Sequence, residues 1–147
     1  MHIGYIIIGH GEYSVGMFDA INLILGAQNN IKALTFEINE SPDELYSKII
    51  QSIDELNCDY YIIFTDILGG TPYNTAALIA GKDPRIEVIT GANLPMLLEA
   101  ILRRDTTTDL NLLKKIIIEN AINGIKINSE LIKKSYCETN NVDNEGI

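Results

Sequence analysis

The sequence predicts an α/β domain in which a doubly wound, four-stranded parallel sheet carries helices on both faces. The main observation is that short apolar runs rich in β-branched residues alternate with longer segments whose apolar residues recur every three or four positions. A second observation is that these runs are nearly continuous, as expected of parallel strands buried on both faces. Right-handed crossovers then place the connecting helices over the sheet.

The first half of the chain supplies two strand-then-helix units. Its clearest local signal is a helix start at "SPDE": Ser41 can cap the helix, Pro42 suits the first helical position, and Glu44 completes a capping box. The predicted strands cover residues 2–8 and 31–38, and the predicted helices cover residues 15–25 and 41–56.

The second half continues the alternation and then changes character. A glycine-rich stretch, "ILGGTP", leads from the third strand into a helix that begins at Thr71-Pro72 and ends at Gly81. The remaining predictions are strands over 59–66 and 85–90, helices over 93–104 and 106–123, and a short alternating strand over 124–128. We expect a domain over residues 1–132 and a loosely held polar tail over 133–147.

Composition restricts the classes of function. The chain has 147 residues, 46% of them hydrophobic, which suits one domain with one core. Its formal net charge of -9 repels phosphate backbones and anionic membrane surfaces, so we expect no nucleic-acid partner. The apolar run over 3–8 is too short for a signal sequence, and Cys58 and Cys137 form no paired metal-binding motif. We therefore expect a cytoplasmic protein without a metal or another cofactor.

A histidine and an aspartate follow the first and third predicted strands. Ligands of open α/β sheets bind beyond the carboxyl ends of the strands, where the strand order reverses. The first strand ends at Gly9-His10-Gly11 and the third at Thr65-Asp66, and these two strands are usually neighbours. A carboxylate that accepts the Nδ1 proton of an imidazole leaves Nε2 as a nucleophile. We therefore expect Asp66 to orient His10.

The surrounding residues suggest a cradle for a phosphoryl group on this histidine. Two helices start beside it, and helix N-termini bind anions through their free amides. The second start carries the Thr71 hydroxyl, while Gly69 and Gly70 allow close approach of the backbone. Each residue also has a structural interpretation: His10 as a hydrogen-bonded loop residue, Asp66 as a turn former, and Thr71 as a helix cap. Their convergence at one sheet edge favours a function.

Other α/β chemistries lack the residues they need. The dinucleotide fingerprint requires a third glycine at position 14, which is Ser14. A nucleophile elbow around that serine requires glycine at position 12, which is Glu12. A receiver domain places an aspartate where Asp66 stands but also needs an acidic pair after the first strand, and "GHGE" supplies one acidic residue.

Three motifs resemble the enzyme IIA domain of the mannose class of the bacterial sugar phosphotransferase system. With the helix spacing, the resemblance covers residues 1 to about 128. It implies that His10 is phosphorylated on Nε2, that Asp66 hydrogen-bonds it, and that Thr71 lies beside the phosphoryl group. The motifs are "GHG" at 9–11, "TDILGGTPYNTA" at 65–76 and "EVITGANLPMLLEAILRR" at 87–104.

The resemblance also implies partners and an assembly. His10 would accept phosphate from the phosphocarrier HPr and pass it to a cognate IIB protein, which serves the membrane subunits IIC and IID. The family fold adds one antiparallel strand that is exchanged between the subunits of a homodimer, and "GIKIN" at 124–128 matches it. Many members continue into a IIB domain, whereas this chain is expected to be a free-standing IIA.

Alternatives at this point include a phosphocarrier subunit of a dihydroxyacetone kinase and a regulatory module whose phosphorylated His10 reports sugar flux without onward transfer. A plain ligand-binding domain, in which the histidine is never modified, is a further alternative. Specificity for the sugar lies in the IIB and membrane subunits, although the motifs "GGTP" and "EVITG" favour an amino-sugar branch of the family, such as the one for N-acetylgalactosamine.

Overall fold

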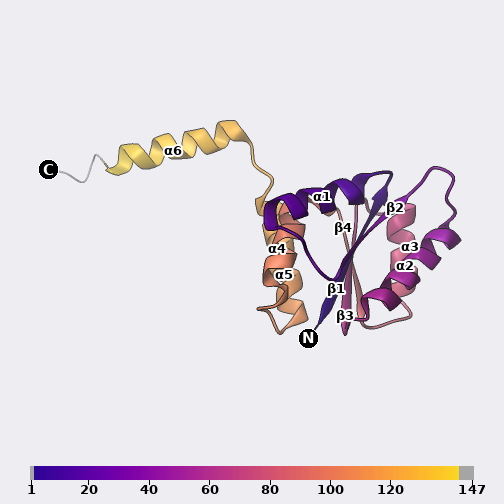
Figure 1. Cartoon of the computed structure of the whole chain (residues 1–147). Coiled ribbons are helices and arrows are strands. Elements are labelled where there is room, and N and C mark those ends of the chain that lie inside the picture. The colour runs from indigo at the N-terminus through magenta and orange to yellow at the C-terminus, as the bar shows by residue number, and fades with distance from the viewer. Residues whose placement is uncertain (1, 143–147) are drawn as a thin grey trace.

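The computed structural model describes residues 2–142 and shows the predicted alternation of strands and helices (Figure 1). One sheet contains four parallel strands in the order β2-β1-β3-β4. The strands are β1 (Ile3–His10), β2 (Ile31–Phe36), β3 (Tyr60–Thr65) and β4 (Ile86–Thr90). The helices are α1 (Tyr13–Leu25), α2 (Pro42–Leu56), α3 (Thr71–Ala80), α4 (Leu94–Arg104), α5 (Leu110–Asn123) and α6 (Asn128–Val142).

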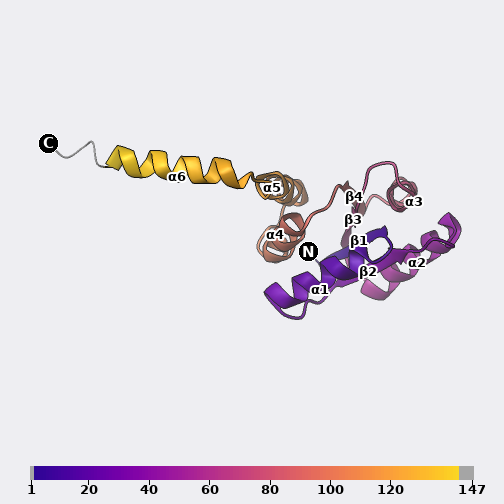
Figure 2. The same ribbon diagram turned by 90° about the horizontal axis from the view of Figure 1, so that it is seen from above.

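The helices cover both faces of the sheet, which confirms the doubly wound α/β prediction (Figure 2). Alternate residues of β1 enter two separate apolar cores, because successive side chains of a strand point to opposite faces. Tyr5 and Ile7 pack with α1, α4 and α5, whereas Ile6 and Ile8 pack with α2 and α3. The central strand is thus buried on both sides, as its continuous apolar run indicated.

The predicted capping box at the start of α2 is present. The Ser41 hydroxyl accepts a hydrogen bond from the Glu44 amide at 3.2 Å, and the Glu44 carboxylate accepts one from the Ser41 amide at 2.7 Å. The preceding strand, β2, ends at Phe36, two residues earlier than predicted. Glu37 leaves the strand because its amide donates to the Glu40 side chain at 3.0 Å.

The C-terminal region differs from the prediction. Residues 125–127 form no strand in this single chain, and residues 128–142 form α6, which extends away from the domain in both views (Figures 1 and 2). A strand needs a neighbouring edge with which to pair, and in the single chain this segment pairs with none. The tail was predicted to be loose because it is polar, but polarity does not oppose helix formation where helix-forming side chains such as Leu131, Lys133 and Lys134 are present. Positions 143–147 of the predicted tail lie outside the described residues.

Within residues 2–142, the helices are too short or too polar to cross a lipid bilayer.

Replacing Ser41 with alanine should lower the free energy of unfolding by about 1 kcal/mol, because the Glu44 amide loses the side-chain oxygen that accepts its hydrogen bond. Urea unfolding followed by circular dichroism measures the change. Ser47→Ala is the matched control, since the Ser47 hydroxyl only donates back to the Asp43 carbonyl within the same helix. Equal losses in the two variants would contradict a capping role.

Candidate functional site

His10 is the last residue of β1 and lies beside the end of β3, where the topology places the first residue of the following loop, Asp66. The strand order puts β1 and β3 side by side at the centre of the sheet, so their carboxyl ends form the switch point that the sequence indicated. The His10 side chain is 50% exposed, while that of Asp66 is 15% exposed. A half-exposed imidazole is therefore held at the surface by a mostly buried carboxylate.

The Asp66 carboxylate is fixed by three donors. Its Oδ2 lies 2.7 Å from Nδ1 of His10 and accepts the His10 backbone amide at 2.9 Å, and its Oδ1 accepts the Ile67 amide at 2.8 Å. Burial alone would raise the pKa of Asp66, but the hydrogen bonds from the amide and ring of His10 and from the Ile67 amide hold the pKa below its ordinary value. The carboxylate is therefore ionised at neutral pH.

An ionised carboxylate can only accept hydrogen bonds, so the contact determines the tautomer of His10. Nδ1 must carry the proton that it donates to Asp66, and in the neutral ring Nε2 then holds an unshared electron pair. The geometry thus brings together the two residues that the sequence analysis paired.

Two contacts fix the plane of the imidazole. The Phe36 ring meets it edge-on, with the centroids 5.7 Å apart and the planes at 83°. On the β3–α3 loop, a Cβ atom added to Gly70 would stand 3.0 Å from Cε1 of His10 and 3.1 Å from Cγ2 of Ile67. A side chain at position 70 would therefore crowd the ring, and glycine allows the close approach of this loop.

The β3–α3 loop is folded against the start of its own helix. Gly69 has a φ of 78°, a conformation that favours glycine, and its carbonyl accepts a bond from the Asn74 side chain at 3.0 Å. Gly70 stands at the N-cap of α3, and Thr71 is the first helical residue, partly exposed beside the loop that contacts the histidine. The structure thus brings Gly69, Gly70 and Thr71 to the edge where His10 lies.

The two helices that start next to His10 have no side-chain cap. Neither Glu12 at the start of α1 nor Gly70 at the start of α3 supplies a side-chain hydrogen bond to the helix amides. The helices that follow the outer strands differ, because Ser41 caps α2 and Asn93 caps α4 through side-chain oxygens. The first amides of α1 and α3 therefore have no side-chain acceptor. An anion could accept their hydrogen bonds instead.

Tyr13 makes contacts beside the site that the sequence analysis did not predict. Its ring fills the space above Gly9, where an added Cβ would stand 2.3 Å from Cδ1 of Tyr13, and its hydroxyl donates to the Ala92 carbonyl at 2.5 Å. Burial, with a smaller effect from the charge of Asp66, raises the pKa of Tyr13 to about 12. The signal for this contact in the sequence is Gly9, the residue before the histidine, because glycine leaves room for a large ring to pack on β1.

Fold and site together define an α/β domain with an oriented, exposed histidine between two helix starts that can bind an anion. A family model described as "PTS system fructose IIA component" matches residues 4–117. The chain therefore belongs to the EIIA-man family and is an EIIA-type component of the sugar phosphotransferase system. This confirms the resemblance that the three sequence motifs indicated.

Individual relatives agree with this assignment. The chain is 32% identical over 129 residues to the "PTS system fructose-specific EIIA component" of Bacillus subtilis, covering 87% of this chain and 82% of that protein. It is 29% identical over 127 residues to the "PTS system mannose-specific EIIAB component" of Escherichia coli K12, covering 86% of this chain but 39% of that protein. A solved EIIA structure from Streptococcus agalactiae matches with a TM-score of 0.82 and 28% identity, covering 87% and 98% of the two chains.

Replacing Asp66 with asparagine should shift neutral His10 toward the tautomer that carries its proton on Nε2, because an amide is a weaker acceptor than a carboxylate for the Nδ1 proton. Nitrogen-15 NMR of the imidazole at alkaline pH reads the tautomer directly. Asp59→Asn is the matched control, since Asp59 accepts the His2 amide instead. An unchanged His10 spectrum in Asp66→Asn would contradict the orienting role.

Proposed function

We propose that Nε2 of His10 carries a phosphoryl group, which it accepts from phospho-HPr and passes to a cognate IIB protein during sugar uptake. One observation carries this proposal: Asp66 holds the Nδ1 proton while the ring stays half exposed between helix starts without side-chain caps. Membership of the EIIA-man family supports the same reaction class.

The exchange needs no proton transfer at His10. The electron pair of Nε2 attacks the phosphorus, the bond from phosphorus to the donor histidine breaks, and the donor nitrogen keeps that bond's electrons. Nδ1 retains its proton, so the phosphorylated ring carries a positive charge that faces the Asp66 carboxylate at 2.7 Å. Attack by the acceptor histidine on IIB reverses these events. Asp66 therefore stabilises the phosphorylated ring without joining a bond to phosphorus.

In this proposal, backbone amides and a hydroxyl group stabilise the negative charge of the phosphoryl oxygens. Such transfers are promoted mainly by positioning and by donors aimed at the equatorial oxygens. Amides at the starts of α1 and α3 and the Thr71 hydroxyl are the donors that we assign, and Gly69 and Gly70 let the backbone approach the phosphorus. These donors stabilise the oxygens without a divalent cation.

The protein would act in the cytoplasm. The phosphoryl group that it carries would reach the sugar through IIB and the membrane subunits IIC and IID. The amino-sugar preference remains a prediction, because the relatives described above are named for fructose and for mannose. The unit that performs the exchange is the predicted domain over residues 1–132.

His10→Ala should abolish labelling when the chain is incubated with enzyme I, HPr and radioactive phosphoenolpyruvate, because the accepting nitrogen is lost. His2 is the other histidine of the sequence, so His2→Ala is the matched control and should label like the natural chain. The label should be released by acid, as phosphate on a histidine nitrogen is. Acid-labile phosphate that persists in His10→Ala would refute the assignment.

We also propose that two copies form a dimer by exchanging residues 124–128. Among residues 2–142, no strand lies beside the outer edge of β4, which borders a groove of about 610 Å³ whose lining includes Ile89, Ile118 and Ile122. The opposite edge is partly covered, because Lys48 donates to the Thr35 carbonyl of β2 at 3.2 Å. A strand from a second copy would cover the open edge in a closed two-fold arrangement.

The segment itself suits this exchange. Ile125 and Ile127 flank Lys126 in an alternating pattern, and they are 72% and 59% exposed in the single chain. Pairing against β4 of a second copy would bury both isoleucines and complete the backbone hydrogen bonds of that edge.

A chain that ends at residue 123 should therefore sediment as a monomer or aggregate at micromolar concentration, since it lacks the exchanged segment. A chain that ends at residue 132 retains the segment and should remain a dimer, so it serves as the matched control. A stable dimer of the shorter chain, or a monomer of the full chain, would show that this segment does not join the subunits.

A further inference from the structure

The start of α1 is tied to the sheet on two sides by the side chains of its first two residues. The Tyr13 hydroxyl donates at 2.5 Å to the Ala92 carbonyl, in the loop between β4 and α4. The Ser14 side chain is buried, and its hydroxyl donates to the Leu34 carbonyl of β2 at 2.8 Å. Contacts with distant parts of the chain therefore fix where this helix begins.

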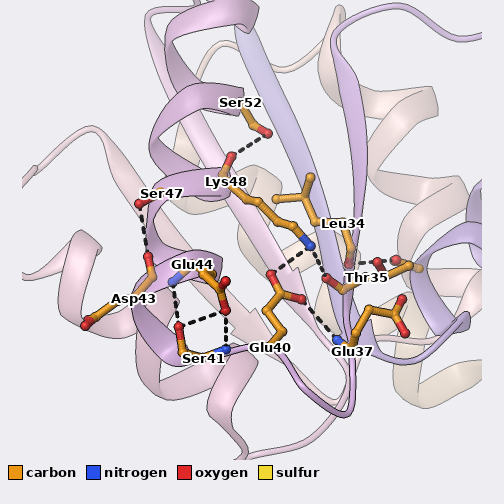
Figure 3. Close-up of polar contacts among 11 residues, drawn as sticks. Leu34, Thr35, Glu37, Glu40, Ser41, Asp43, Glu44, Ser47, Lys48 and Ser52 are labelled. Atoms are coloured by element: carbon orange, nitrogen blue, oxygen red, sulfur yellow. Dashed lines mark hydrogen bonds and ion pairs between the residues drawn. The ribbon is translucent and has the colours of Figure 1, made fainter.

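Both acceptors of these bonds are themselves held in place. The Ala92 amide donates to the carbonyl of Thr65, at the end of β3, at 3.1 Å. Leu34 precedes Thr35, whose carbonyl accepts a bond from Lys48 of α2 at 3.2 Å (Figure 3). The start of α1 is thus linked to β2 and β3, the two neighbours of the strand that ends at the histidine.

The turn that carries His10 is fixed at both of its glycines. The Tyr13 ring lies over Gly9, where an added Cβ would overlap Cδ1 of that ring. The Gly11 amide donates to the Phe36 carbonyl at the end of β2 at 3.0 Å. The imidazole therefore projects from a short segment whose two ends have little freedom to move.

The first amides of α1 have no acceptor within the helix. The first bond at this helix start runs from the Gly16 amide to the Glu12 carbonyl at 2.9 Å, and the amides of residues 13–15 precede it. A serine near a helix start often caps its helix, but the Ser14 hydroxyl is used for the tether to β2. The chain thus fixes the position of these amides without supplying a side-chain acceptor for them.

We propose that Tyr13 and Ser14 are positioning residues for the phosphorylation of His10. The proposal rests on the function proposed above. Their hydroxyl bonds hold the turn between β1 and α1, so that the imidazole and the first amides of α1 keep the spacing that a phosphoryl group needs. Donors that are already in place promote transfer because they need not be reorganised during the reaction. Burial raises the pKa of Tyr13 to about 12, so its hydroxyl keeps the proton that it donates at neutral pH.

Tyr13→Phe removes one tether and keeps the ring over Gly9. It is assayed with two donors, phospho-HPr and the small molecule phosphoramidate, in which Nε2 attacks the phosphorus and ammonia leaves. Both rates should fall by about tenfold, because a donor to a charged oxygen is no longer held in place. Tyr5→Phe is the matched control: the Tyr5 hydroxyl donates to the Ala100 carbonyl at 2.8 Å in the same core, at the far end of β1, so both rates should stay unchanged.

Ser14→Ala tests the second tether in the same assay. Both rates should again fall, since the helix start loses its bond to β2. Ser52→Ala is the matched control, because the Ser52 hydroxyl is also buried but donates to the Lys48 carbonyl within α2 at 2.9 Å. Equal rates for the two serine variants would overturn the role of Ser14.

Amide NMR distinguishes positioning from a loss of stability. Phosphorylation of the natural chain should move the amide proton signals of residues 13–15 downfield, because these amides then donate to phosphoryl oxygens. The movement should be smaller in Tyr13→Phe and unchanged in Tyr5→Phe, whereas urea unfolding should show a loss of stability in both variants. Signals that move equally in the two variants would mean that the Tyr13 hydroxyl has a structural role alone.

The two donors also distinguish this proposal from the proposed function. Tyr13→Phe with the rates of Tyr5→Phe would overturn the positioning role and leave the function of His10 intact. A fall with phospho-HPr alone would overturn it as well, because it would indicate a contact with the donor protein. A natural chain that accepts phosphate from neither donor would contradict the proposed function and the positioning role with it.

Discussion

The contact between the His10 ring and the Asp66 carboxylate is the interaction around which the site is organised. It exists because β1 and β3 are neighbours, so that the loops after two strands far apart in the sequence end side by side. The carboxylate also accepts two backbone amides, which makes the end of β1 and the start of the next loop part of the same network. One ionised group therefore links the ends of both strands to the orientation of the His10 ring.

The two edges of the sheet differ in how far they are covered. On the β2 side, Lys48 pairs with Glu40 and donates to the Thr35 carbonyl, so part of the edge is covered. On the β4 side, the edge borders a groove that is lined in part by isoleucines. A strand from a second copy would therefore pair along β4 rather than along β2.

The sequence predicted what depends on local chemistry or on the topology that alternation implies. The capping box at Ser41 is local, and the pairing of His10 with Asp66 follows from the usual order of parallel strands. The bond from Tyr13 to Ala92 joins residues 79 positions apart, and no local pattern specifies it. The strand predicted over 124–128 depends on an edge that the single chain does not offer it, so its alternating pattern alone could not decide its structure.

If His10 is phosphorylated as proposed, the absence of side-chain caps on α1 and α3 would make the lifetime of the protein depend on that phosphorylation. A missing side-chain cap costs about 1 kcal/mol of helix stability, or a few tenths where glycine is the N-cap residue, as in α3. The cap is missing at the two central helix starts, whereas the helices after the outer strands keep theirs. An oxyanion held by those amides restores the lost hydrogen bonds only in the folded state, so it stabilises that state. We expect the phosphorylated protein to unfold less often and to resist proteases longer than the unphosphorylated one. Turnover of the chain would then depend on the supply of phosphoryl groups.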